Sequence, residues 1–228
     1  MDGIIEKFNI FDLFTMLIPG VIISILFGIS LSYEYYEIWN TFGSEKYTVF
    51  IIMSYLCGVV MQQIGNVLDE KIMYKHIYGG HPREIILLNS KYNKVLNDEL
   101  SYNEVLKIKK YIIKKYKMND GNIENSKQLN ASIFSYCLIL VEKNHLTYKS
   151  DKMLVISEMS RSLALGCMLT IFLNLVMICK YRYHYEFYII ENMLLLILTN
   201  IFFYRKIQYE KYRYNNVLKT FLIYMYEK

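Results

Sequence analysis

The chain has few cysteines, and none of them are paired at a metal-binding or redox spacing. Four cysteines occur in 228 residues, with no C-x-x-C pattern. Zinc ribbons and thiol redox pairs require that spacing, so the sequence predicts neither. Cys57, Cys167 and Cys179 fall within apolar runs, and Cys137 lies in an apolar stretch of a charged region. Because cysteine in such surroundings acts as a small buried apolar residue, we predict no metal or cofactor.

Sequence motifs of the common hydrolases, kinases and metalloproteases are also missing. The chain contains no G-x-S-x-G, no H-E-x-x-H and no G-x-x-x-x-G-K-[ST]. These patterns place a nucleophile, two zinc ligands and a phosphate-binding loop. The four histidines stand apart from one another and from carboxylates at zinc-ligand spacing. The sequence therefore predicts a protein that is not an enzyme. A membrane-embedded enzyme, whose residues would converge only on folding, is the less favoured alternative.

Charge is absent from three long apolar stretches and scarce in a fourth. Residues 13–33, 47–68 and 162–179 contain no Asp, Glu, Lys or Arg, and residues 188–204 contain only Glu191. A helix needs roughly 20 apolar residues to cross a bilayer, and lipid excludes open sheets. These stretches predict four transmembrane helices, with Glu191 at the outer interface. The lack of charge deep in the spans argues against a proton-coupled transporter.

The remaining residues carry most of the charge and divide the chain. Overall 54% of residues are hydrophobic and 21% are charged. We predict an all-α protein: a four-helix transmembrane bundle with a helical cytoplasmic module between spans two and three. Its expected segments are residues 1–68 (an N-terminal segment, with a short interfacial helix over 1–12, and spans one and two), 69–161 (the module), 162–204 (spans three and four) and 205–228 (an amphipathic tail).

The distribution of Lys and Arg near the spans predicts the orientation. Thirteen such residues flank the spans on the side that holds both termini and the module, against three on the other side. The three are Lys46, Lys180 and Arg182. Because cytoplasmic segments carry the excess of positive charge, we predict a bacterial inner-membrane protein with both termini in the cytoplasm.

Local signals predict where several helices begin. Ser101 and Glu104 form a capping-box pattern, which predicts a helix over 102–118. Tyr78-Gly79-Gly80-His81-Pro82 predicts a break, with a helix from Pro82 to about residue 94. Further helices are expected over 126–143 and from about residue 150 into span three. Pro19 lies inside span one and predicts a kink there.

Small residues recur at a spacing of four along three spans, which allows helices to approach closely. One explanation is tight packing within a single chain. The other is an oligomer interface or a pore lined by one stripe. The candidate positions are Gly20, Ser24, Gly28 and Ser32 in span one, Ser54 and Gly58 in span two, and Ser162, Gly166 and Thr170 in span three.

Two polar residues and one lysine cluster complete the candidate sites. Asn174 and Asn200 lie within spans, where such residues form interhelical hydrogen bonds or line an ion path. A basic cluster on the predicted helix over 102–118 suits a solvated face, lipid headgroups, or a nucleotide or RNA ligand. Its members are Lys107, Lys109, Lys110, Lys114, Lys115 and Lys117.

Four short motifs carry a resemblance across the chain: Phe8-Asn9-Ile10-Phe11-Asp12-Leu13, Leu17-Ile18-Pro19-Gly20, Gln62-Gln63-Ile64-Gly65 and Ser160-Arg161-Ser162-Leu163-Ala164. Together with the four-span layout, they resemble small membrane proteins of bacterial antiphage defence systems. These include the membrane subunit of Kiwa, four-span CBASS effectors and membrane accessories of type VI CRISPR. The resemblance implies a cytoplasmic module that senses a protein or nucleotide signal and an oligomeric membrane part that responds.

The expected function is therefore a membrane sensor or effector that forms a homo-oligomer and contacts lipids. A soluble defence protein and a nucleotide or RNA are its expected partners. The alternative is a monomeric, non-catalytic scaffold that recruits a soluble cytoplasmic partner.

Overall fold

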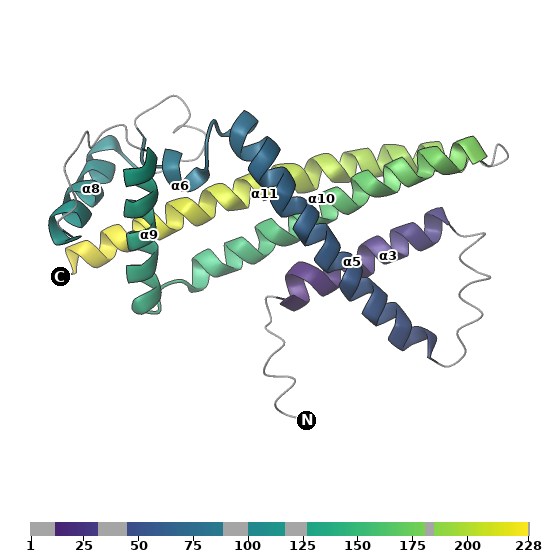
Figure 1. Cartoon of the computed structure of the whole chain (residues 1–228), viewed down its shortest axis with the longest axis horizontal. Helices are drawn as coiled ribbons and strands as arrows, with labels where there is room; N and C mark the ends of the chain where they lie inside the picture. Colours follow the sequence, from purple (N-terminus) through teal and green to yellow (C-terminus); the bar gives the residue numbers. More distant parts are fainter. Residues whose placement is uncertain (1–11, 32–44, 89–99, 117–126, 181–184, 228) are drawn as a thin grey trace. The chain divides into compact units, whose positions relative to one another are not determined.

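The computed structural model describes residues 12–31, 45–88, 100–116, 127–180 and 185–227, and those residues form helices and no strand (Figure 1). The all-α prediction is confirmed. In chain order the elements are the π-helix η1 (Leu13–Leu17), α3 (Ile18–Ser30), α5 (Lys46–Leu68), the π-helix η2 (Asp69–Ile77), α6 (Pro82–Ile85), α8 (Tyr102–Tyr116), α9 (Lys127–Lys143), α10 (Tyr148–Lys180) and α11 (Tyr185–Tyr226).

Among the described residues, four helical segments are long and apolar enough to cross a membrane. They are Leu13–Ser30, Lys46–Ile85, Tyr148–Lys180 and Tyr185–Tyr226. The chain is therefore a membrane protein, and we take the apolar stretches defined above as its membrane-spanning segments. Three of the helices extend well past those stretches. The sequence predicts such an extension for α10, whereas the tail, predicted as a separate segment, continues span four within α11.

The chain forms two compact units. The first, here called the spanning unit, combines Met1–Asn66 with Val155–Ile207. The second, the charged unit, combines Val67–Leu154 with Gln208–Lys228. Each boundary between the units falls within a helix, namely α5, α10 and α11. The same three helices therefore supply residues to both units.

In the spanning unit, α3 packs closely against α5 and α10 because glycine stands at the crossing points. A Cβ atom at Gly20 would collide with the backbone of Ser54, and one at Gly58 would collide with the backbone of Met16. A Cβ at Gly166 of α10 would collide with Ile23 of α3. Only a residue without a side chain permits this approach.

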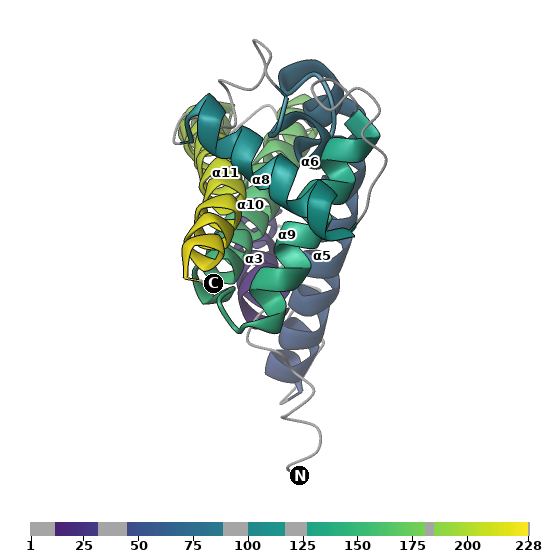
Figure 2. The same cartoon turned by 90° about the vertical axis from the view of Figure 1, so that its left-hand side faces the viewer.

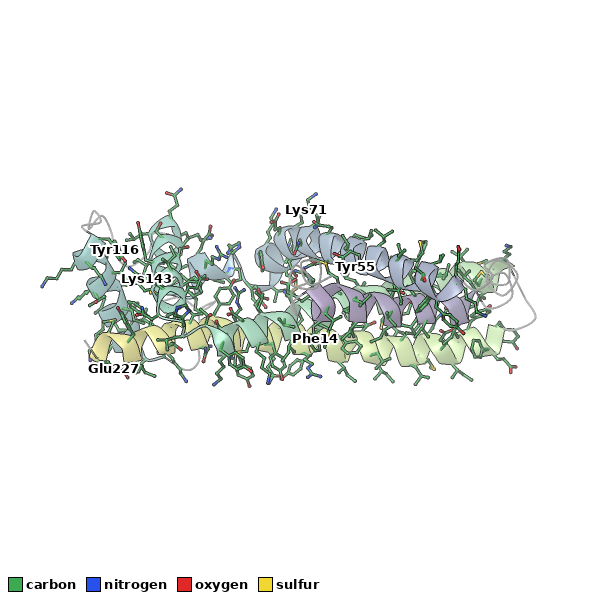
Figure 3. All side chains as sticks on the ribbon, turned by 90° about the horizontal axis from the view of Figure 1, so that it is seen from below. Phe14, Tyr55, Lys71, Tyr116, Lys143 and Glu227 are labelled. Atoms are coloured by element: carbon green, nitrogen blue, oxygen red, sulfur yellow. The ribbon has the colours of Figure 1, made fainter. Side chains whose placement is uncertain are left out.

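The spanning parts of α10 and α11 lie side by side (Figures 1 and 2). The hydroxyl of Ser157 donates to the carbonyl of Lys206 at 3.3 Å, which joins the two helices. Many apolar side chains of this unit face outward, as the side chains along η1 and α5 show, where Phe14 and Tyr55 are labelled (Figure 3). Outward apolar side chains are what a helix bundle presents to lipid.

The helix through Pro19 changes its geometry in the turn that precedes the proline. Residues Leu13–Leu17 form a π-helix, and the N–H of Ile18 donates to the carbonyl of Leu13, five residues earlier. Proline cannot donate a backbone hydrogen bond and crowds the preceding turn. The wider π turn accommodates it at the start of α3.

The charged unit has an apolar core formed by α6, α8, α9 and the C-terminal part of α11. These helices face the viewer in Figure 2. Tyr111 of α8 contacts Phe221, and Phe134 of α9 contacts Tyr214, with ring centroids 5.9 and 5.1 Å apart. Further buried core residues are Ile85, Ile86, Ile108, Ile112, Ile133, Val217 and Leu218. Such a packed core is what stabilises a water-facing helical unit.

The capping box is confirmed at the start of α8. The backbone N–H of Ser101 donates to the carboxylate of Glu104 at 2.7 Å, and the N–H of Glu104 donates back to the Ser101 hydroxyl at 3.4 Å. The hydroxyl of Ser101 also donates to the Glu104 carboxylate at 2.7 Å, and this bond, followed by the one from the Ser101 N–H, lowers the pKa of Glu104. The predicted helix from Pro82 is described only over Pro82–Ile85. The predicted helix is wrong beyond Ile85, because residues 86–88 form a turn. The rest of its expected length, most of the expected interfacial helix over 1–12, and the end of the helix over 102–118 lie outside the described residues.

Enlarging Gly58 should destabilise the spanning unit. In Gly58→Leu, the new side chain would force α5 away from η1, at a cost of about 1–3 kcal/mol or more. We expect a lower midpoint of thermal unfolding in detergent, whereas Val60→Leu, at an exposed position of the same helix, should unfold like the wild type. Equal unfolding of both variants and wild type would contradict the close packing.

Candidate functional site

A polar pocket lies in the charged unit. Its volume is about 420 Å³, within the usual range for small-molecule sites. Eight side chains or backbone segments line it: Glu70, Tyr74 and Lys75 from η2, Gly79, Gly80 and His81 from the turn that follows, Glu84 from α6 and Lys127 from α9. Four parts of the chain therefore converge on one site.

The turn after η2 gives the pocket its backbone wall. Gly79 has φ of 73°, a left-handed conformation that glycine adopts readily and that ends helices. The N–H of Gly80 donates to the carbonyl of Tyr74 at 2.7 Å. His81 then caps α6, since its Nδ1 accepts from the N–H of Arg83 at 3.3 Å. The break predicted at this position is thus a turn with its own hydrogen bonds.

A buried carboxylate accepts a hydrogen bond from Tyr74, one of the residues that line the pocket. Glu210 of α11 is 6% exposed and accepts hydrogen bonds from the hydroxyls of Tyr74 and Tyr78, at 3.3 and 3.1 Å. Burial and the neighbouring carboxylate raise the pKa of both tyrosines. Burial also raises the pKa of Tyr214 to about 12, with Glu210 contributing. All three phenols therefore remain protonated at neutral pH, and those of Tyr74 and Tyr78 donate to Glu210.

The pocket offers both signs of charge beside aromatic rings. The ammonium groups of Lys75 and Lys127 lie with the carboxylates of Glu70 and Glu84 in its lining. Lys127 also donates to the carbonyl of Gly79 at 3.4 Å.

The rings of Tyr74 and His81, which both line the pocket, have centroids 4.8 Å apart. Burial, followed by the charge of Arg83, lowers the pKa of His81. Its imidazole is therefore neutral at pH 7, as the cap on α6 requires. This lining suits a polar ligand that carries a ring and a charged group.

The small residues predicted as packing or interface positions lie mostly at contacts within the chain. Gly20, Ser54, Gly58 and Gly166 are buried at the helix crossings described above, and Ser24 hydrogen-bonds Cys57. Ser162 and Thr170 are buried in α10, and Gly28 is half-buried in α3. Ser32 lies outside the described residues.

The two predicted intramembrane asparagines differ in their surroundings. Asn200 is exposed, and its amide donates to the carbonyl of Leu196 in its own helix at 2.8 Å. Asn174 is fully buried, and its Nδ2 donates to Glu191 and to Asn192 of α11, each at 3.0 Å. Asn174 therefore forms the interhelical hydrogen bond that the sequence suggested.

The structure describes five of the six predicted lysines, all on α8, and four of them are exposed. Lys109 is 4% exposed, whereas Lys107, Lys110, Lys114 and Lys115 are exposed. Lys107 donates to the hydroxyl of Tyr226 at 3.1 Å, and Lys115 lies over the rings of Tyr111 and Tyr116. Lys117 lies outside the described residues.

No protein-family model, no curated protein and no solved structure matches this chain.

Sequence reasoning missed the pocket and the role of Glu191. The pocket residues belong to three separate elements and the turn, so no local pattern joins them, although the Gly79-Gly80 break marks one wall. Glu191 is predicted at the outer membrane interface, and the sequence did not predict that its carboxylate accepts hydrogen bonds from Asn174 and Ser30. Its isolation in an otherwise uncharged segment was the available signal.

Acid should destabilise the charged unit through His81. The folded state lowers the pKa of His81, so its contribution to stability is complete above the unfolded pKa of about 6.5 and is lost as pH falls. Asparagine can cap α6 without titrating. We therefore expect His81→Asn to lose about 1 kcal/mol less stability than the wild type when the pH falls from 7 to 5.

Thermal unfolding in detergent across this pH range measures the effect. His145→Asn is the control, because His145 is exposed and has φ of 55°, which asparagine tolerates. If His81→Asn lost as much stability in acid as the wild type and the control, the capping role would be wrong.

Proposed function

We propose that this chain is a multipass inner-membrane sensor and effector of a bacterial antiphage defence system. On this proposal the charged unit faces the cytoplasm and receives a signal at the pocket, and the spanning unit responds as part of an oligomer, with pore opening as the response. The four short sequence motifs support the defence role, and the excess of Lys and Arg supports the orientation.

The pocket of the charged unit carries the proposal. Lys75 and Lys127 suit a phosphate group, the carboxylates of Glu70 and Glu84 suit the amino groups of a base, and the Tyr74 ring suits stacking. The volume of about 420 Å³ suits a ligand the size of a nucleotide. We therefore propose a small nucleotide as the signal.

The location of the pocket on a π-helix supports a signalling role. Glu70, Tyr74 and Lys75 all belong to η2, which continues directly from the spanning helix α5. π-helical segments are rare and occur frequently at functional sites. A ligand that binds the π form more tightly than the α form shifts the equilibrium between them. Since the two forms differ in length and rotation, that shift would move the chain on one side of η2 relative to the other.

Removing the two pocket lysines should weaken nucleotide binding. We expect a panel of mononucleotides and cyclic nucleotides to include one that binds the full-length protein in detergent. Lys75→Gln with Lys127→Gln should weaken that binding by at least about tenfold, because two charge-assisted hydrogen bonds are lost. Isothermal titration calorimetry measures the affinities.

The matched control is Lys110→Gln with Lys114→Gln, which removes the same charge from exposed positions of α8. Equal losses in both double variants would indicate nonspecific attraction to the basic surface. Failure of the whole panel to bind would overturn the nucleotide proposal.

Oligomer formation has its own test. Gly28 of α3 is half-buried and is not one of the glycines at the helix crossings. If it lies at an interface between copies of the chain, Gly28→Leu should lower the mass of the detergent-purified particle while membrane insertion is retained. Light scattering measures that mass. A wild-type monomer would instead favour the alternative function, a scaffold that recruits a soluble cytoplasmic partner.

A further inference from the structure

Two carboxylates of the pocket in the charged unit are left for a ligand to satisfy. Glu70 and Glu84 both line the pocket, and within the described part of the chain neither side chain accepts a hydrogen bond or joins an ion pair. An ionised carboxylate can only accept hydrogen bonds, which it does with two oxygens side by side. A ligand with two adjacent N–H groups therefore satisfies both oxygens of one carboxylate at once.

Glu84 is the better enclosed of the two carboxylates. It is half-buried, whereas Glu70 is exposed. Its Oε2 lies 3.6 Å from the position that a Cβ atom would take on Gly80 in the pocket wall, and its backbone N–H donates to the carbonyl of His81 at 2.8 Å. Hydrogen bonds are stronger where less water surrounds them, so Glu84 discriminates between ligands more sharply than Glu70 does.

His81 adds a hydrogen-bond donor to the same turn. Its Nδ1 accepts from the N–H of Arg83 at 3.3 Å, so the single proton of the neutral imidazole is on Nε2. Among the residues that the structure describes, no group accepts from that Nε2–H. The turn that carries His81 and Glu84 thus offers the pocket one donor and one carboxylate acceptor.

Guanine is the common base whose edge complements this donor and this carboxylate. Its O6 accepts a hydrogen bond, and its adjacent N1–H and N2 amino group both donate. Adenine and cytosine present one amino group beside an unprotonated ring nitrogen, so the second carboxylate oxygen would face a lone pair. Uracil presents a single N–H between two carbonyls. With each of these three bases, one carboxylate oxygen would lose its donor, which is costly away from water.

We propose that the pocket selects a guanine nucleotide. The carboxylate of Glu84 accepts from N1–H and from the N2 amino group of the base, and the Nε2–H of His81 donates to O6. Tyr74 offers its ring to the base, and Lys75 and Lys127 are left for the phosphate. This inference rests on the proposed function, because it requires a nucleotide in this pocket.

Isothermal titration calorimetry of the full-length protein in detergent tests the choice of base with four nucleoside monophosphates: GMP, IMP, AMP and XMP. Wild type should bind GMP at least about tenfold more tightly than AMP. IMP lacks the N2 amino group and should fall between them. In Glu84→Gln, the carboxamide still accepts from N1–H but donates where the carboxylate accepted. That variant should lose affinity for GMP and gain affinity for XMP, which carries a carbonyl in place of the amino group.

Glu70→Gln is the matched control, because it removes the same charge from an exposed position of the same pocket. It should keep the wild-type order of GMP, IMP and AMP. Wild type that binds AMP as tightly as GMP would overturn the guanine inference and leave the nucleotide site standing. Equal weakening of all four nucleotides in Glu84→Gln would also overturn it, since Glu84 would then only support the fold. If no nucleotide binds, the proposed function fails as well.

Discussion

The close approach of α3 to its neighbours is the constraint on which the spanning unit depends. Gly20 and Gly58 let the first helix meet α5 at backbone distance, and Gly166 makes room for Ile23 at α10. Because α3 is held between these helices, Ser30 at its end reaches Glu191 of α11. Larger residues at the glycines would separate the helices and with them Ser30 and Glu191. Packing in the middle of these helices thus determines whether Ser30, at the end of α3, reaches Glu191.

The charged unit depends on a different interaction, the burial of Glu210 against two tyrosines. Its hydrogen bonds to Tyr74 and Tyr78 join α11 to η2 and fix the inner wall of the pocket. Replacing Glu210 with an apolar residue would leave two buried hydroxyls without their acceptor. Both units therefore rely on a carboxylate in an apolar setting. In the charged unit the donors are phenols, whereas in the spanning unit they are an amide and a hydroxyl.

The sequence predicted the elements better than the sites. Long uncharged segments predict spanning helices because lipid permits few alternatives, and Ser101 with Glu104 predicted a helix start because a capping box is a local interaction. The small-residue stripes predicted close packing, and the structure places Gly20, Gly58 and Gly166 at contacts within one chain.

The pocket region and the hydrogen bonds of Glu191 join residues far apart in the chain, such as Tyr74 with Glu210 and Ser30 with Glu191. A single sequence carries no signal for such pairs. The π geometry of η2 was not predicted from the sequence.

The central claim is that a signal received at η2 alters the spanning unit. Hydrogen–deuterium exchange of the full-length protein in lipid nanodiscs, with and without the tightest-binding nucleotide, tests it most directly. The account predicts changed exchange in η2 and also in the residues of α10 and α11 that belong to the spanning unit. A change confined to η2, α6 and α9 would contradict the claim, because the ligand would then bind without reaching the membrane part.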